Sequence, residues 1–481
     1  MANLWVKKSI AQLTQETEGG THALKRTLGP AGLIALGIGA IIGAGLFTDT
    51  ADAAANYAGP AVTISFIIAG IGCALAGLCY AEFASMIPIA GSAYTYSYAT
   101  MGEFVAWIIG WDLVLEYGVA SAKIAISWSE YFNKLLDTLF HTTIPYQWCH
   151  SPFQSSAEGV NGIMNIPALC IIILLSVVLM RGVKGSSFVN SIIVIIKISI
   201  VLLFIGFGWQ YIQSGNHRPY IPENTSHVFG QYGWTGILKG ASIVFFAFIG
   251  FDAVSTAAQE AKHPKKDMPK GILLSLLICV VLYILFAHVL TGVAHYSEFK
   301  TVGKETSVTY VVDTYMKGQG WLSTLITVAI LAGFSSVMLV MLMGQSRIFF
   351  SLSKDGLVPP IFSQLHRKFR TPFKSNILFA VFVGLIAAFV PAEVVGNMTV
   401  IGTLFAFVLV CAGIIVLRKT NPGIERPFKT PWVPVVPLLG ILVCGGLMYA
   451  QEGMVWLRLI VWLLIGVAIY FLYGIRNSKL R

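Results

Sequence analysis

Long apolar runs are the feature of this sequence that most limits the folds open to it. A helix needs about 20 apolar residues to cross the roughly 30 Å hydrocarbon core of a membrane. Segments of alternating hydrophobicity, the mark of a membrane β-barrel, are not found. The sequence therefore predicts an all-α membrane protein with 12 transmembrane helices, spans 1 to 12, at residues 33–58, 60–86, 102–133, 163–181, 187–212, 236–260, 271–294, 323–352, 376–391, 396–418, 433–450 and 455–474.

The distribution of positive charge predicts how the chain sits in the membrane. With twelve spans both termini lie on one side, and 23 of the 32 lysines and arginines fall on that side against seven on the other. Cytoplasmic loops carry the excess of such residues. We therefore expect residues 1–32 and 475–481 to be cytoplasmic segments of a multi-pass protein of the cell (plasma or inner) membrane. Residues 1–28 lack the apolar core of a signal peptide.

Several function classes find no support in the sequence. The net charge of +10 comes from short scattered loops, so no nucleic-acid partner is expected. Six of the seven cysteines lie in apolar spans and no C-x-x-C or histidine cluster occurs, so no metal or other cofactor is expected. Zinc-protease, nucleophile-elbow and P-loop motifs are also missing, and we expect no enzyme.

Span 1 carries four glycines in "GIGAIIGAGLF", residues 37–47. The spacing of Gly39 and Gly43 is that of small residues at helix–helix contacts, which is one interpretation. Span 6 is also interrupted, by Gly250 and Asp252 in "FFAFIGFDAV". Interrupted spans at matching positions favour a second interpretation, a transporter of two inverted repeats at 33–212 and 236–418, followed by two extra helices at 433–474.

Two unwound helices would present backbone groups that a substrate could satisfy, because unpaired peptide groups in lipid cost several kcal/mol each. An amino acid carries the matching charges. Its carboxylate would accept from the N–H groups of Gly43, Ala44 and Gly45, at the positive end of a half-helix. Its ammonium would donate to carbonyl groups near Ile41, Ile42, Phe246, Ala247 and Ile249.

Several motifs together resemble the amino acid-polyamine-organocation (APC) superfamily and, within it, bacterial proton-coupled permeases of the cationic amino acid transporter family. They are "GIGAIIGAGLF", "YAEFASMIPIAGSAYTYSYAT", "GWDLVLEYGVAS", "FFAFIGFDAVSTAAQE", "HPKKDMPKG", "SRIFFSLSKDGLVPP" and "IGTLFAFVLV". The resemblance implies a 5+5 inverted repeat with discontinuous helices 1 and 6, a site lined by spans 1, 3, 6 and 8, and two peripheral helices. Two departures stand out. Relatives commonly have Ser or Thr in place of Ala44, and neutral residues in place of Asp49 and Asp52.

Lys197 lies roughly 15 Å from either end of span 5, too deep to reach water easily. A charge so placed is functional by default. By resemblance Lys197 takes the place of a sodium ion between spans 1, 5 and 8. We expect it to couple transport to protons by holding span 1 to span 8 through Ser335 and Ser336. A permanently paired structural lysine is the alternative.

Acidic residues in the spans receive separate predictions. Glu116, the acid of "LEYG", is expected in the pocket by resemblance, paired with Lys197 or water, whereas Asp112 suggests a structural ion pair. Asp252 could contact substrate or cap the inner half of span 6. Glu82 and Glu260 lie at cytoplasmic ends, where we expect gate or helix-end roles with loop cations as partners.

Substrate size is predicted from span 8. Met338 and Met341 are three residues apart and could face one cavity, although core packing is the alternative. By resemblance Met341 lies at the side-chain subsite beside Phe246, where a thioether shortens the pocket and offers no counter-charge. Small neutral L-amino acids such as alanine are therefore favoured. Asp49 and Asp52 favour arginine, lysine or ornithine instead.

The sequence thus predicts a secondary active transporter that imports amino acids with protons by alternating access. Its partners would be the amino acid, the proton, the lipid bilayer and a possible small single-span accessory protein. A channel and a transporter-like sensor are the alternatives of a different class.

Overall fold

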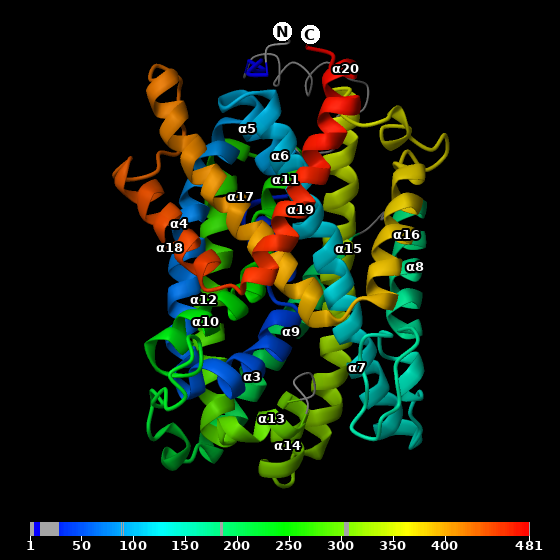
Figure 1. The fold of residues 1–481 in the computed structure, drawn as a ribbon, viewed down its shortest axis with the longest axis vertical. Helices are drawn as coiled ribbons and strands as arrows, with labels where there is room; N and C mark the ends of the chain where they lie inside the picture. Colours follow the sequence, from blue (N-terminus) through cyan, green and yellow to red (C-terminus); the bar gives the residue numbers. More distant parts are fainter. Residues whose placement is uncertain are drawn as a thin grey trace.

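The computed structural model describes residues 4–9, 28–87, 89, 91–182, 186–302 and 307–480, and the regular secondary structure of these ranges is helical. Most helices run along the long axis of the molecule (Figure 1). Only residues 4–9 and 28–32 of the predicted cytoplasmic segment 1–32 fall within the described ranges.

All twelve predicted spans are helical. Within the described ranges, eight segments are long and apolar enough to cross a membrane: Gly45–Met86, Glu103–Phe140, Ser191–Tyr211, Gly233–Thr256, Pro264–Val293 (α12), Gly320–Lys354 (α15), Ala392–Thr420 (α17) and Gly453–Asn477. Four shorter apolar helices are also found in the described residues: Pro30–Ile41 (α2), Ile166–Arg181 (α8), Phe373–Phe389 (α16) and Val435–Tyr449 (α18). The first long segment contains α3 (Thr50–Ala53) and α4 (Val62–Met86), with Gly59 at a φ of +60° between them.

Both predicted helix interruptions are present. Helix α2 ends at Ile41, Ile42 is extended, and a π-helical turn, Gly45–Asp49, starts the next half of span 1. Span 6 consists of α10 (Gly233–Val244), a 3-10 turn at Phe245–Phe248 and α11 (Ala253–Thr256). Gly250 lies between them at a φ of +107°, a region that glycine adopts without steric penalty.

Span 3 has an irregularity that the sequence did not reveal. Helices α6 (Glu103–Leu113) and α7 (Ala120–Phe140) are joined by a π-helical turn, Val114–Val119. Such turns shift the register of a helix and are frequent at functional sites. The described part of segment 87–101 contains a buried helix, α5 (Ser92–Thr100).

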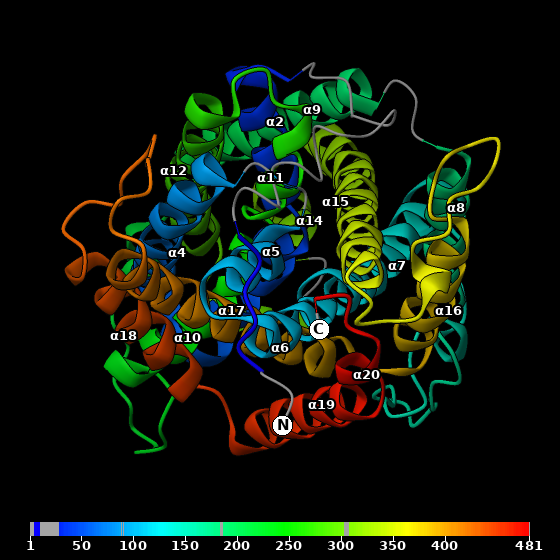
Figure 2. The ribbon, with the colours of Figure 1, turned by 90° about the horizontal axis from the view of Figure 1, so that it is seen from above.

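The helices around the two breaks form the interior of the bundle, where α2 packs against α12 and α9 (Ser186–Gly208). Helices α18 and α19 (Gly453–Ile469) lie outside α17 (Figures 1 and 2). Leu442 and Leu464, one on each outer helix, are exposed as lipid-facing residues would be.

Both ends of the described chain meet at one end of the bundle, which we call the terminal face. Lys8 Nζ is 2.5 Å from Asp355 Oδ1, and the Asp355 carbonyl accepts a hydrogen bond from Lys479 N. This end is uppermost in Figure 1, beside α20 (Ile475–Asn477). The end of the bundle away from it is called the opposite face below.

Candidate functional site

The two helix breaks meet at a central cavity. Seven residues predicted for the substrate site line it: Ile41, Gly43, Ala44, Gly45, Phe246, Ile249 and Met341. Ala40, Ala120, Ile124 and Val337 complete the lining. The volume open to the centres of water-sized spheres is about 10 Å³, which is enough for about one water molecule. The cavity is therefore nearly closed around the breaks.

The backbones of the two breaks almost touch beside this cavity. A Cβ atom on Gly45 would lie 2.5 Å from Ala247 N. At the start of the outer half of span 1 the first N–H groups have no partner within the helix, and the positive end of the helix dipole lies there too. The cavity thus offers donors for a carboxylate, while its side-chain walls are uncharged.

Tyr283 of α12 bridges the breaks. Its hydroxyl lies 3.0 Å from the Ile41 carbonyl oxygen and 2.9 Å from that of Ala247. One hydroxyl has one proton, so it donates fully to one carbonyl at a time. The other carbonyl is available to a second donor, such as an ammonium group. Sequence reasoning missed Tyr283, although a hydroxyl in the middle of an apolar span signals a buried hydrogen bond.

Lys197 of α9 binds the end of α2. Its ammonium donates to the carbonyl oxygens of Gly39 at 2.8 Å and Ile42 at 2.9 Å. A positive charge is stabilised at a helix C-terminus, where carbonyl groups are left unpaired. The lysine stem lies along Gly333 of α15, where a Cβ would come within 2.9 Å of Lys197 Cε. Lys197 therefore lies between span 1 and span 8.

The structure differs from the predicted serine link at Ser335. The Ser335 hydroxyl donates to Leu331 O of its own helix at 2.8 Å, and Lys197 meets α15 at Gly333 instead. Ser336 is buried in the same helix. Nothing in the sequence indicated that Gly333 would be the residue that leaves room for the Lys197 side chain.

The acidic residues of span 3 face different partners. Glu116 lies against Asp252, and not against Lys197 as one prediction had it. Asp252 accepts hydrogen bonds from Tyr117 at 2.5 Å and Ser92 at 3.2 Å, and it does not cap α11 with its side chain. The predicted ion pair of Asp112 is wrong, since its buried carboxylate has no partner among the described residues.

Three predicted substrate residues lie beside the cavity without lining it. The Ile42 carbonyl binds Lys197, Ala247 packs against Gly45, and Glu116 turns toward Asp252. Met338 is also buried away from the cavity, and Val337 takes its place. Of the missed lining residues, Val337 had a helical signal, because it precedes Met341 by four residues. Ala120 and Ile124 lie beyond the π-helical turn of span 3, so regular helical spacing did not indicate them.

Glu82 and Glu260 both form ion pairs. Glu82 receives two hydrogen bonds of 2.9 Å from Arg418 of α17, and the loop residue Arg426 lies 3.4 Å away. Glu260 pairs with Arg347 of α15 at 2.9 Å, where a loop cation was expected. Glu260 and Arg347 also line a cavity toward the terminal face that has about 390 Å³ of space by the same measure.

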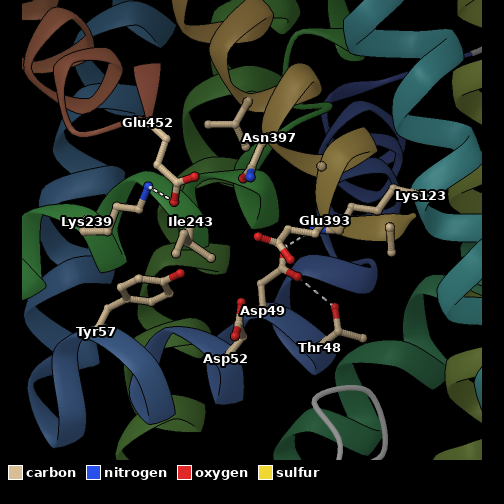
Figure 3. Close-up of a pocket in the computed structure, with 13 residues that line it drawn as sticks. Thr48, Asp49, Asp52, Tyr57, Lys123, Lys239, Ile243, Glu393, Asn397 and Glu452 are labelled. Atoms are coloured by element: carbon tan, nitrogen blue, oxygen red, sulfur yellow. Dashed lines mark hydrogen bonds and ion pairs between the residues drawn. The ribbon is translucent and has the colours of Figure 1, made fainter. Parts of the chain in front are cut away.

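A third cavity, the vestibule, is lined by residues of α3, which lies toward the opposite face in Figure 1, and of the start of α17. Figure 3 shows its lining residues. It has about 70 Å³ of space for the centres of water-sized spheres. Asp49 and Lys123, which line it, form an ion pair of 2.5 Å. Lys123 Nζ also lies 3.8 Å from the centre of the Phe246 ring, a cation–π contact. Lys123 therefore lies in a different environment from Asp112 and Glu116 of the same span.

Fold and site define a helical membrane protein with a small cavity between two broken helices. A family model described as amino acid permease matches residues 28–472. The chain is 44% identical to the branched-chain amino acid permease BcaP of Bacillus subtilis (strain 168), over 99% of this chain and 98% of that one. It is 41% identical to the methylthioribose transporter of the same organism, over the whole of both chains.

A plant relative is more distant. The vacuolar cationic amino acid transporter 4 of Arabidopsis thaliana is 32% identical, over 88% of this chain and 68% of that one. The extent of these matches shows that the chain belongs to the amino acid permease family. It is a multi-pass membrane protein of the APC superfamily, a family of transporters.

Proposed function

We propose that this permease imports neutral amino acids together with protons by alternating access, with small L-amino acids such as alanine favoured. The observation that carries the proposal is the central cavity, where two helix breaks offer backbone donors and acceptors and the side chains carry no charge. We place the protein in the cell membrane as a twelve-span, 5+5 inverted repeat with both termini in the cytoplasm. The terminal face is then cytoplasmic and the vestibule opens outward.

Substrate choice follows from the cavity walls. Ile124, Val337 and Met341 would surround an aliphatic side chain, and the space between them is small. A cationic substrate finds no carboxylate among the residues that line this cavity, and Asp49 nearby is already paired with Lys123. Small neutral amino acids therefore fit better than arginine, lysine or ornithine.

Branched-chain amino acids are the second candidate. Two relatives, from Bacillus subtilis (strain 168) and Lactococcus lactis subsp. cremoris (strain MG1363), are named branched-chain amino acid permeases. Valine or leucine would need Met341 to turn away, which an unbranched thioether can do at little cost. The 41% identical methylthioribose transporter adds a neutral substrate of another class to be tested.

Proton coupling is assigned to Lys197. While it carries its proton, the ammonium satisfies two carbonyl oxygens at the end of α2. Loss of the proton removes the charge that the helix end stabilises, so α2 is held less firmly against α15. The inner half of span 1 can then move, which couples the proton to alternating access.

The test is uptake into proteoliposomes. We expect saturable accumulation of alanine above its external concentration, driven by a pH gradient that is acidic outside. Lys197→Ala should abolish accumulation but retain counterflow, because the backbone site remains. Flux that never exceeds equilibrium would indicate a channel, and binding without flux a sensor. Competition by twenty amino acids and methylthioribose would rank the candidate substrates, and preference for arginine would refute the proposed specificity.

A further inference from the structure

Two charged residues inside the membrane separate the central cavity from the vestibule. The ion pair of Asp49, in the outer half of span 1, and Lys123, in α7, has side chains that are each about 10% exposed. The free-energy cost of removing two ions from water is often larger than the gain from their attraction. A buried ion pair is therefore weak evidence for a purely stabilising role. Ionisable residues at such depth point to function.

The pair is held in place from two further spans. Phe246, which lines the central cavity, lies under the ammonium group of Lys123. On another side, Gly396 of α17 lies so close that a Cβ there would be 2.9 Å from Lys123 Nζ. The contact thus joins elements of both proposed repeats, spans 1 and 3 with spans 6 and 10, directly beside the site.

We propose that Asp49, Lys123 and Phe246 form the outer gate of the substrate site, closed by the ion pair. The proposal rests on the proposed function. While the gate is closed toward the vestibule, the larger cavity of about 390 Å³ lies on the cytoplasmic side, as alternating access requires. Opening would separate Asp49 from Lys123 and release the Phe246 ring.

The vestibule makes this opening feasible. Its space corresponds to about five waters, at about 10–15 Å³ for each, and it reaches both ions of the pair. Polar side chains such as Asn397 and Glu393 line the same space (Figure 3). The separated ions can therefore be rehydrated there, and they would not be left bare in an apolar medium.

The test measures the rates of alanine binding and release by the full-length protein in detergent. The variant Asp49→Asn with Lys123→Met removes the ion pair and leaves no single buried charge behind. If the pair closes the gate, association and dissociation should both become about tenfold faster, while Kd changes by less than about threefold. A residue that only contacts substrate would change Kd, and a purely structural pair would lower stability without this paired acceleration.

Two further variants complete the design. Exchange of the two residues, Asp49→Lys with Lys123→Asp, should restore slow rates if the ion pair itself closes the gate. Lys239→Met with Glu452→Gln removes another ion pair of the vestibule, 3.4 Å long and with a largely exposed glutamate, and should leave both rates unchanged. The gate proposal would be refuted if the control variant bound and released alanine as fast as the first variant. It would also be refuted if the first variant kept the rates of the parent protein. If the parent binds no amino acid at all, the proposed function fails instead.

Discussion

Substitution of Gly45 by alanine should disrupt the site without adding a charge or a large side chain. The added Cβ would lie 2.5 Å from Ala247 N, in the backbone of the other broken helix. Ordinary contacts of carbon atoms need about 3.5–4.0 Å. The two breaks must therefore move apart by about 1 Å, and neither backbone can avoid the contact by changing a rotamer.

The expected magnitude follows from this overlap. Added methyl groups in well-packed interiors cost about 1–3 kcal/mol. If that cost is borne by the substrate-bound state, the affinity for alanine falls by about 5- to 150-fold, since 1.4 kcal/mol is a factor of ten. Equilibrium binding of radiolabelled alanine to purified protein measures this change directly.

Gly43→Ala is the matched control. It adds the same methyl group two residues away, where the nearest atom is Val337 Cγ2 at 3.3 Å. A side chain can move by the few tenths of an ångström required, so we expect an affinity within about threefold of the parent. If a folded Gly45→Ala protein bound alanine as the parent does, the close approach of the two breaks would have no part in binding.

Three other substitutions give separate expectations. Tyr283→Phe removes the hydroxyl shared by two break carbonyls and should weaken alanine binding about 3- to 10-fold, from a hydrogen bond worth about 1 kcal/mol; unchanged affinity would refute the bridging role. Glu82→Gln should lower the thermal unfolding midpoint, because hydrogen bonds between charged groups are worth about 1.5–3 kcal/mol, and a change in Kd with unchanged stability would contradict this. Met341→Ala should raise the uptake of leucine relative to alanine at least about fivefold in competition assays, and an unaltered ratio would exclude Met341 from the side-chain subsite.

The helix breaks could be predicted because their causes are local. Glycines within an apolar span and Gly250 before Asp252 are visible in the sequence, and the structure interrupts the helices at both places. The seven lining residues on these breaks and at Met341 followed from the same reasoning or from the family resemblance. Lys197 was recognised by its depth in span 5, and its predicted role came from the family resemblance.

The partners of the charged residues could not be predicted in the same way. Asp49 and Lys123 are 74 positions apart, and neither flanking sequence indicates the other. The π-helical turn at Val114–Val119 also lies between Asp112 and Lys123, so a spacing that predicts one face for a regular α-helix no longer does so. Pairing depends on how spans 1, 3 and 6 pack, which no local pattern encodes.

The deep charges follow one physical rule once the packing is known. Lys197 is compensated by carbonyl groups at a broken helix, and Lys123 by Asp49 and the Phe246 ring. Asp112 has no such partner among the described residues, and Glu116 has a second acid beside it. A buried carboxylate without a cation needs water or a proton. The interior of this permease therefore places its cations where they hold helices together, and its acids without a cation where water or a proton is needed.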